Sequence, residues 1–567
     1  MMNLTLMKRI LSFLACFLIS LPALLAEEPL RERVYISTDR DVYVAGDAVW
    51  LSAWCLDAAT GRLSPFSKVA YVEVHSSTGM VQTSKISLEG GRGAGRLTLP
   101  SSLPTGNYRL FAYTRAGAAE EGFDATAAAR TLSVFNTLST ERTAGGVEVV
   151  DSAPQATATP TAGALEIRGG QAAKSGKARL SLVNRGPEAI SFSLSVRHDD
   201  GIPAPATAHI TDFVEAVHAL PEVRTFKPGV TPEYEGEIIY AHVAGTDAEG
   251  LRALHNQIAF VSAPGSGENL VTEAIAEDGS VSFFTSNLYG NKELFLEIEG
   301  ADAARNCHLE LENPFLDLPA GEIPTLPLWN GWRSALELRG LAMQLEKNFD
   351  ADTLYTALPA RVYHVFDERD RVRYILDDYT RFPVMEELFI EFIPEIRARR
   401  ADDKRELQVR ISDRLGSVYF PTSSALVLLD GVPVLDHERI LAYDPLLVKC
   451  IDIYPHIYFL GARIFPGVVN FVTYKGTLPS MQFADNVRIV DFQGCSLPLA
   501  YTCAGVDGEY PDYRQTIYWH PLLTLAPGES LELECKTPAY GGRFDVVAEG
   551  LTAEGAAVCS KATLDVR

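Results

Sequence analysis

Basic residues are scarce in this sequence. It has 50 Lys and Arg against 73 Asp and Glu, which gives a formal net charge of −23 over 567 residues. A surface of that sign repels phosphate backbones and anionic lipid headgroups, so we predict no nucleic-acid partner. A chain of this length exceeds what one hydrophobic core usually organises, and several domains are therefore expected.

The common motifs of catalysis and metal binding are also lacking. The sequence has no His-Glu-x-x-His, no Gly-x-Ser-x-Gly and no phosphate-binding glycine loop. His209 and His218 lie nine residues apart, and Cys307 directly precedes His308. Both spacings favour ordinary surface or core residues over metal ligands.

Acidic residues supply the remaining candidates. Two pairs, Asp199-Asp200 and Asp350-x-Asp352, lack the full loop of oxygen ligands that calcium takes. A hydrolase reading would need two carboxylates that face a cleft. The acidic cluster available for it comprises Asp377, Asp378, Glu386, Glu387, Glu391 and Glu395.

The helical spacing of this cluster argues against catalysis. Glu387 and Glu391 lie four residues apart on a predicted helix whose opposite face is apolar, so both are expected in solvent. We predict no catalytic residue, no cofactor and no metal site, and hence a protein that is not an enzyme. A hydrolase that uses the cluster is kept as an alternative.

Long apolar runs are absent except at the N-terminus. Lys8 and Arg9 precede an apolar stretch over residues 10–26, a pattern typical of a signal peptide cleaved after Ala26. A lipoprotein signal with Cys16 lipidated is the alternative. No other segment approaches the ~20 apolar residues of a spanning helix. We therefore expect an exported protein without a transmembrane segment in the mature chain.

The cysteines leave the redox state open. An exported protein can form disulfides, but an odd number of cysteines leaves at least one thiol unpaired within a monomer. Buried free thiols are the alternative, and spacing does not decide the connectivity. The seven that follow residue 26 are Cys55, Cys307, Cys450, Cys495, Cys503, Cys535 and Cys559.

Period-two alternation predicts β-sandwiches along most of the chain. Over residues 48–57, Val49 and Leu51 alternate with Trp50 and Ser52. Similar patterns recur over residues 177–196, 233–299 and the last 80 residues, with Pro and Gly turns between them. A Pro/Ala/Thr/Ser linker over residues 151–163 has nothing to bury.

Two segments instead have helical periodicity. The first would place on one face Leu338, Leu341, Leu345 and Phe349. The second, which Pro383 and Pro394 would delimit, would align Met385, Leu388, Phe389 and Phe392.

Residues 34–115 resemble the macroglobulin-type β-sandwich of alpha-macroglobulins and related bacterial envelope proteins. The resemblance rests on "STDRDVYVAGDAVWLSA" and "LPTGNYRLFAYT". It implies a β-sandwich, and it raises a protease-inhibitor or defence role as an alternative function. The Cys-Gly-Glu-Gln thioester run of those inhibitors is missing, and the segment "DSAPQATATPTAG" is the one candidate for an exposed bait region. Residues 233–299 look like a carboxypeptidase-regulatory-like sandwich.

Residues 425–476 resemble the plug domain of TonB-dependent receptors. The matching features are "ALVLLDGVPVLD", "DPLLVKCIDIY" and "YFLGARIFPGVVNFVTYKG". Asp430-Gly431 predicts a tight hairpin, and Asp444-Pro445 predicts an N-cap with an N1 proline. The receptor barrel would need about 22 strands of about 9–11 residues, whereas about 90 residues follow Gly476. We therefore expect a plug-like recognition module without its barrel.

The order of these parts is similar to a group of exported multi-domain proteins of Bacteroidota. The predicted fold class is mainly β and multi-domain, with serial macroglobulin/Ig-like β-sandwiches, a short helical connector, an α+β plug-like domain and a C-terminal β-sandwich. The expected units are a signal peptide (1–26), a macroglobulin-type sandwich (27–140), a linker (141–165), a second β-sandwich (166–228), a carboxypeptidase-regulatory-like sandwich (229–314), a helical connector (315–395), the plug-like domain (396–485) and the C-terminal β-sandwich (486–567).

This architecture predicts a non-enzymatic scaffold or protein-binding protein of a Gram-negative cell envelope. We expect it in the periplasm or associated with the outer membrane, and exposure at the cell surface is an open alternative. Its expected partners are other envelope or outer-membrane proteins.

Overall fold

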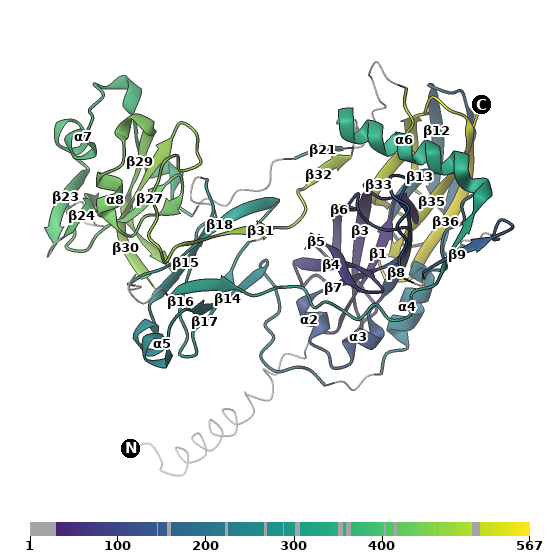
Figure 1. The fold of residues 1–567 in the computed structure, drawn as a ribbon, viewed down its shortest axis with the longest axis horizontal. Helices are drawn as coiled ribbons and strands as arrows, with labels where there is room; N and C mark the ends of the chain where they lie inside the picture. The colour runs from purple at the N-terminus through teal and green to yellow at the C-terminus, as the bar shows by residue number, and fades with distance from the viewer. Residues whose placement is uncertain are drawn as a thin grey trace, which may run out of the picture.

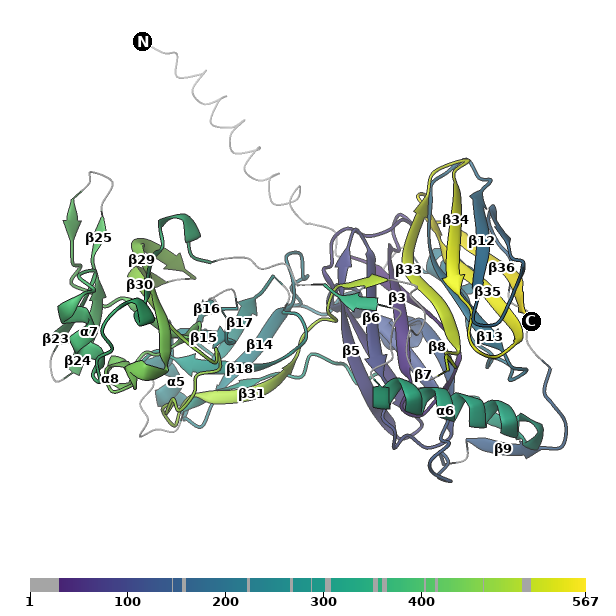
Figure 2. The same cartoon turned by 90° about the horizontal axis from the view of Figure 1, so that it is seen from above.

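The computed structural model shows a mainly β, multi-domain protein (Figure 1). In both views the described residues between 365 and 483 lie at one end; we call them the plug-like unit only because a plug domain was expected there. The third unit, which comprises described residues between 233 and 311 together with 488–493, lies in the middle, and two β-sandwiches lie side by side at the other end (Figures 1 and 2). The residues described are 30–144, 146–155, 160–221, 225–265, 269–286, 288–300, 307–349, 355–358, 365–401, 404–412, 417–461, 463–501 and 511–567. The predicted signal peptide, with Cys16, lies outside them.

The first sandwich holds the strands expected for residues 27–140. Its eight strands run in the order β1-β3-β6-β5-β4-β7-β8-β2. They are β1 (Glu32–Thr38), β2 (Val42–Val44), β3 (Ala48–Asp57), β4 (Val69–Ser76), β5 (Gly79–Glu89), β6 (Arg92–Thr98), β7 (Gly106–Tyr113) and β8 (Ala129–Phe135). Between β7 and β8 lie the short helices α2 (Arg115–Ala118) and α3 (Phe123–Thr126).

Both faces of strand β3 are buried. Val49 and Leu51 pack into the core of the first sandwich. On the other face, Trp50 packs with Trp519, and the Ser52 hydroxyl donates a 2.7 Å hydrogen bond to the Pro521 carbonyl. The side chains of β3 that point away from the core of the first sandwich therefore contact a second domain and not water.

The second sandwich is built from two distant segments of the chain. Strand β12 pairs with β34, and β13 lies between β33 and β35. The predicted units 166–228 and 486–567 thus share one sandwich, because neither contributes enough strands to cover its own apolar face. The strands are β10 (Leu165–Arg168), β11 (Gln171–Ala172), β12 (Lys177–Asn184), β13 (Ile190–Asp199), β33 (Thr516–Leu525), β34 (Ser530–Lys536), β35 (Gly542–Thr552) and β36 (Ala557–Val566).

The third unit also takes a strand from beyond its expected boundary. Strand β31 (Arg488–Gln493) pairs with β18 and extends the sheet to β16-β15-β18-β31. The other sheet has the order β17-β14-β19. The remaining elements are β14 (Ile238–Ala244), α5 (Ala248–Leu254), β15 (Ile258–Ser262), β16 (Val271–Ala274), β17 (Ser280–Phe284), β18 (Asn291–Ile298) and β19 (His308–Leu311).

The expected helical connector, 315–395, does not form one unit. Its first part packs on the first sandwich: β20 (Leu326–Trp329) pairs with β9 (Val147–Val150), and α6 (Arg333–Phe349) contacts β2. Strand β21 (Tyr355–Ala357) pairs with β32 (Leu499–Tyr501). The last part, with β22 (Val372–Ile375) and α7 (Met385–Glu391), belongs to the plug-like unit.

The buried face of α6 differs from the predicted one. Leu341 and Phe349, two members of the predicted apolar stripe, are 43% and 59% exposed. The helix instead buries Arg339 and Gly340, with Ala342 and Met343 beside them. The guanidinium of Arg339 is buried because it pairs with Asp200 and donates to the Val42 carbonyl.

The plug-like unit has a sheet in the order β22-β29-β30-β27-β28 with its own core. The predicted Asp430-Gly431 turn joins β27 and β28, and Asp444 caps the turn that starts at Pro445. Helix α7 buries Met385, Leu388 and Phe389, as its spacing predicts. The other elements are β23 (Ile396–Ala401), β24 (Lys404–Val409), β25 (Ile411–Ser412), β26 (Val418–Tyr419), β27 (Leu426–Leu429), β28 (Val432–Pro433), α8 (His437–Leu441), β29 (Val448–Leu460) and β30 (Arg463–Thr473).

Within the described residues Cys55, Cys450, Cys495, Cys535 and Cys559 are free, buried thiols, and Cys307 is also buried. Cys503 lies outside those residues. In the same part of the chain, no helix is both long enough and apolar enough to span a membrane.

Candidate binding site beneath helix α4

Helix α4 (Ile210–His218) connects the first two sandwiches. Its apolar residues Phe213 and Val217 pack in one cluster with Tyr35 of β1 and Leu551 of β35. The backbone N–H of His209 donates a 2.8 Å hydrogen bond to Asp212, which stabilises the first turn. The amphipathic spacing thus fixes α4 across the junction of two domains.

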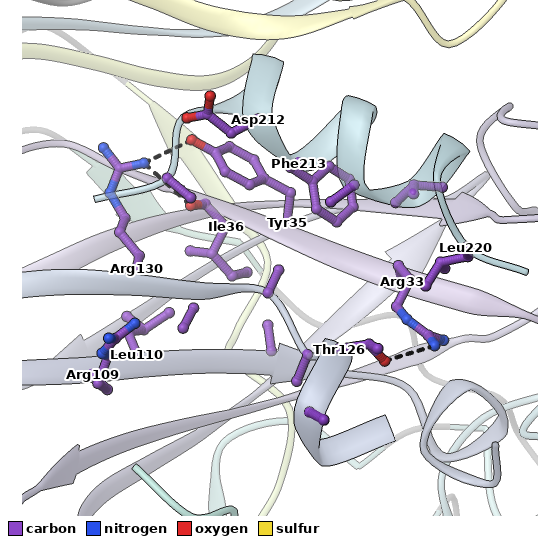
Figure 3. A pocket seen from close by; sticks show the side chains of 18 of the residues that line it. Arg33, Tyr35, Ile36, Arg109, Leu110, Thr126, Arg130, Asp212, Phe213 and Leu220 are labelled. Carbon is purple, nitrogen blue, oxygen red and sulfur yellow. Dashed lines mark hydrogen bonds between the residues drawn. The ribbon is translucent and has the colours of Figure 1, made fainter. Parts of the chain in front are cut away.

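A cavity of about 490 Å³ lies beside α4 (Figure 3). Its floor comes from β1 and β7, with Tyr35, Ile36 and Leu110. Its walls include seven alanines from residues 125–129 and 208–219, and α4 also contributes the larger Phe213 and Val217. These alanines are Ala125, Ala127, Ala128, Ala129, Ala208, Ala216 and Ala219.

One wall of the cavity carries a buried ionic network. Arg130 donates 2.9 Å and 2.7 Å hydrogen bonds to Asp41, and its Nη1 donates a 2.8 Å bond to the Tyr35 hydroxyl (Figure 3 shows the bond to Tyr35). Arg130 also lies 3.3 Å from a carboxylate oxygen of Glu549 in the second sandwich. This network joins the two domains.

The arginines keep the network's carboxylates charged. Burial acts to raise the pKa of Asp41, but Arg130 and Arg197 outweigh it and lower that pKa below its ordinary value. Burial likewise opposes ionisation of Glu549, whose pKa is lowered by Arg130 and His209. Both anions are therefore stabilised by partners already in place. We assign the network a structural role.

Two further arginines line the cavity. Arg33 lies at the far end in Figure 3, where it donates a 3.0 Å hydrogen bond to Thr126 and pairs with Glu120 at 3.0 Å. Arg109 donates a 2.8 Å hydrogen bond to the carbonyl of Glu322, a neutral acceptor. Asp212 is the one carboxylate among the described lining residues.

A second hollow, of about 750 Å³, lies between α6 and the first sandwich. Trp329 and Leu336 line it together with Phe135 and the exposed Val149. Its charged lining residues are Arg142 and the ion pair of Arg333 with Glu337.

The carboxylates of the predicted acidic cluster do not face a common cleft. Glu387 and Glu391 are exposed, as their spacing on α7 predicts. Glu386 pairs with Arg405 at 2.9 Å. The others are engaged separately: Asp377 accepts a hydrogen bond from Tyr474, Glu395 accepts one from Tyr374, and Asp378 is exposed.

The histidine and aspartate candidates are separated by the fold. His209 contacts Glu549 at 3.2 Å at the start of α4, whereas His218 lies at the other end of the helix. Asp199 pairs with Arg543 and Asp200 pairs with Arg339.

The other predicted candidates can be placed only in part. Cys307 is buried, while His308 contacts Glu310 at 3.1 Å. No group of three or more possible metal ligands occurs among the described residues. Asp350 and Asp352 lie outside them, as do residues 156–159 of the proposed bait segment.

Sequence reasoning missed the buried network beside α4. Asp41 and Arg130 lie 89 positions apart, and Arg130 and Glu549 lie 419 apart. A usable signal existed in the strands themselves, because "ARTLSVF" and "VVAEGL" each place one charged residue in an otherwise buried strand. Such a residue indicates a buried partner.

No protein-family model matches the chain, and no curated protein matches it. Among solved structures, Escherichia coli alpha-2-macroglobulin activated by porcine elastase is 10% identical, with 94% of this chain and 44% of that chain covered and a TM-score of 0.24. The native conformation of the E. coli protein is also 10% identical, with 95% of this chain and 40% of that chain covered and a TM-score of 0.24. The adhesin InvE of Yersinia pseudotuberculosis is 10% identical, with 49% of this chain and 57% of that chain covered and a TM-score of 0.13. The chain spans less than half the length of these macroglobulins.

Proposed function

We propose that this protein is an exported, non-enzymatic scaffold of a Gram-negative cell envelope that binds other envelope or outer-membrane proteins. The observation that carries the proposal is an apolar face left exposed on the plug-like unit. An exposed cluster of large apolar side chains on a folded domain is typical of a protein-interaction surface.

This face lies near the end of the β29–β30 hairpin. Phe459 is 72% exposed, Ile464 is 55% exposed and Ile457 is 49% exposed. Phe459 pairs directly with Ile464 across the hairpin, so the three side chains project from one face. We call this set the hairpin patch.

The opposite face of the same hairpin packs against the third unit. Tyr458, Leu460 and Phe465 belong to a cluster that includes Ile258 and Phe260 of β15. The hairpin is therefore already ordered by its packing against the third unit. Little conformational entropy is lost when a partner binds its exposed face.

The scaffold part of the proposal is supported by the polar contacts between domains. Arg130 and Glu549 join the first two sandwiches, and Lys85 and Glu237 join the first sandwich to the third unit. A chain that holds several domains in fixed positions suits a role in positioning partners relative to one another.

Chemical crosslinking in intact cells that produce the protein, followed by mass spectrometry, tests this proposal. We expect crosslinks to a recurring envelope or outer-membrane protein, concentrated on the plug-like unit. Crosslinks within the chain alone, or to cytoplasmic proteins only, would contradict it.

A further inference from the structure

We propose that the cavity beside α4 binds a neutral, apolar molecule of about the size of three benzene rings. The inference is independent of the scaffold role of the protein. It rests on the volume of the cavity, on its apolar lining and on the pairing of the nearby charged side chains with one another.

The volume and the lining of the cavity suit an apolar ligand. A hollow of about 150 Å³ lined by apolar residues holds one benzene ring, and this cavity has about 490 Å³. Ile36 and Leu110 form its floor (Figure 3). Its walls come from α4, with Phe213 and Val217, and from the alanines of residues 125–129. A ligand that covers these side chains gains free energy because apolar surface is removed from water.

The charged network at one end of the cavity is already compensated. Arg130 lies 2.7 Å from Asp41 and 3.3 Å from Glu549. Arg197 supplies a second cation, 3.1 Å from Asp41. Two arginines thus offset two carboxylates. A charged ligand group placed there would lose its hydration without gaining an unpaired partner.

The other two arginines supply no free charge to the interior either. Arg33, at the opposite end in Figure 3, pairs with Glu120 at 3.0 Å. Arg109 directly precedes Leu110 on β7, so its side chain points to the opposite face of the sheet. There it donates a 2.8 Å hydrogen bond to the Glu322 carbonyl. The interior of the cavity therefore favours an uncharged ligand.

The cavity opens to solvent along one flank of α4. Asp212, Ala216 and Ala219 lie on this flank and are exposed, and Ala125 is exposed on the facing wall. A ligand can therefore reach the apolar floor without separation of the two sandwiches. The carboxylate of Asp212 at this opening also disfavours the entry of an anion.

The first experiment compares two fluorescent probes that share one ring skeleton. N-phenyl-1-naphthylamine is neutral, and 1-anilinonaphthalene-8-sulfonate adds one anionic group to it. We expect fluorescence titration of the purified protein to show binding of the neutral probe. The sulfonate should bind at least about tenfold more weakly, because no unpaired cation receives its charge. No binding of the neutral probe overturns the proposal. Equal or tighter binding of the sulfonate overturns the assignment of a neutral ligand.

Matched variants on α4 locate the site. Ala216→Phe places a large side chain in the exposed flank of the cavity, whereas Glu215→Phe places the same side chain on an exposed neighbour that does not line it. We expect A216F to lower the affinity for N-phenyl-1-naphthylamine at least about tenfold, because the added ring occupies the ligand's space. E215F should leave the affinity unchanged. Equal affinity of the two variants, each shown to be folded by circular dichroism, places the probe elsewhere and overturns the proposal.

Thermal unfolding provides a second readout of the same variants. A ligand that binds the folded state alone raises the melting temperature. We expect N-phenyl-1-naphthylamine at a saturating concentration to raise the melting temperature of the unmodified protein and of E215F, and to leave that of A216F unchanged. An equal rise in all three proteins, or no rise in any, contradicts binding in this cavity.

Discussion

Lys85 of the first sandwich and Glu237 of the third unit form an ion pair in which each side chain is only 1% exposed. The Lys85 ammonium also lies 4.2 Å from the ring centroid of Phe492, on strand β31. Phe492 belongs to the returning segment of the chain, so one buried cation contacts two segments of the third unit. This pair therefore helps to fix the relative position of two domains.

We predict that removal of one partner of this ion pair lowers the free energy of unfolding strongly, whereas removal of both partners lowers it much less. Lys85→Met leaves a buried carboxylate without its cation and should lower the free energy of unfolding by about 3–5 kcal/mol. The double variant Lys85→Met/Glu237→Leu should recover most of that loss. Denaturant unfolding of the single and double variants measures the difference. A double variant as unstable as Lys85→Met would show that the pair acts by more than charge compensation.

Arg130 offers a test of the junction between the first two sandwiches. Arg130→Met would leave both Asp41 and Glu549 buried with one cation fewer, and should cost about 3–5 kcal/mol. Arg179→Met is the control, because Arg179 is 83% exposed and its loss should change stability by less than about 0.5 kcal/mol. Thermal unfolding compares the two variants. Similar melting temperatures for both would contradict the structural role of the network.

Glu233 should make stability depend on pH near neutrality. Burial raises the pKa of Glu233 to about 7 from its ordinary value of 4.5, although Arg115 and hydrogen bonds from Ile238 and Tyr71 act to lower it. The fold thus favours the protonated carboxyl, so its contribution to stability is fully present below about pH 4.5 and is lost as the pH rises through about 7.

The variant Glu233→Gln isolates this contribution. Relative to Glu233→Gln, the unmodified protein should lose about 3 kcal/mol of unfolding free energy between pH 4.5 and pH 8. Urea unfolding of both proteins across that range provides the measurement. A difference that stays constant with pH would show that Glu233 titrates with its ordinary pKa.

Glu73 anchors the segment that crosses the first sandwich after the third unit. Its carboxylate accepts hydrogen bonds from the backbone N–H groups of Leu316, Asp317 and Leu318 at 2.8, 3.3 and 3.0 Å. In Glu73→Ala the Leu318 N–H loses its acceptor, so amide hydrogen exchange at Leu318 should become at least tenfold faster. The change at Leu316 should be smaller, because its N–H also donates to the Tyr113 hydroxyl at 2.9 Å. Glu73→Gln keeps one carbonyl oxygen and should have a smaller effect. Exchange that is equally slow in all three proteins would exclude the anchoring role.

The sequence was sufficient to predict local elements but not their long-range partners. Alternation predicted β3 and β13, and apolar spacing predicted the buried face of α7, because each of these patterns depends on near neighbours. It did not reveal that β13 pairs with β33 and β35, more than 300 positions away. Strands of similar length and composition have the same alternation of apolar and polar residues. The alternation therefore does not indicate which distant strands pair with one another.

Buried charge explains why the buried face of α6 differs from the predicted one and why the ionic network beside α4 was not predicted. Arg339 lies on the buried face of α6 because Asp200 neutralises its charge, whereas the apolar periodicity of the helix predicted leucines on the buried face. Arg130, Asp41 and Glu549 line or support the cavity for the same reason. Such positions become apparent only when the partner's location is known.

The most direct test of the scaffold proposal is site-specific photo-crosslinking in cells. A photoreactive amino acid at position 459, in the hairpin patch, is compared with one at position 179, which is exposed on the second sandwich. We predict a discrete crosslinked product with an outer-membrane or periplasmic protein from position 459, absent from position 179 and lost when Ile457→Ser and Ile464→Ser are introduced together. An identical product pattern from both positions, or no product from position 459, would contradict the account.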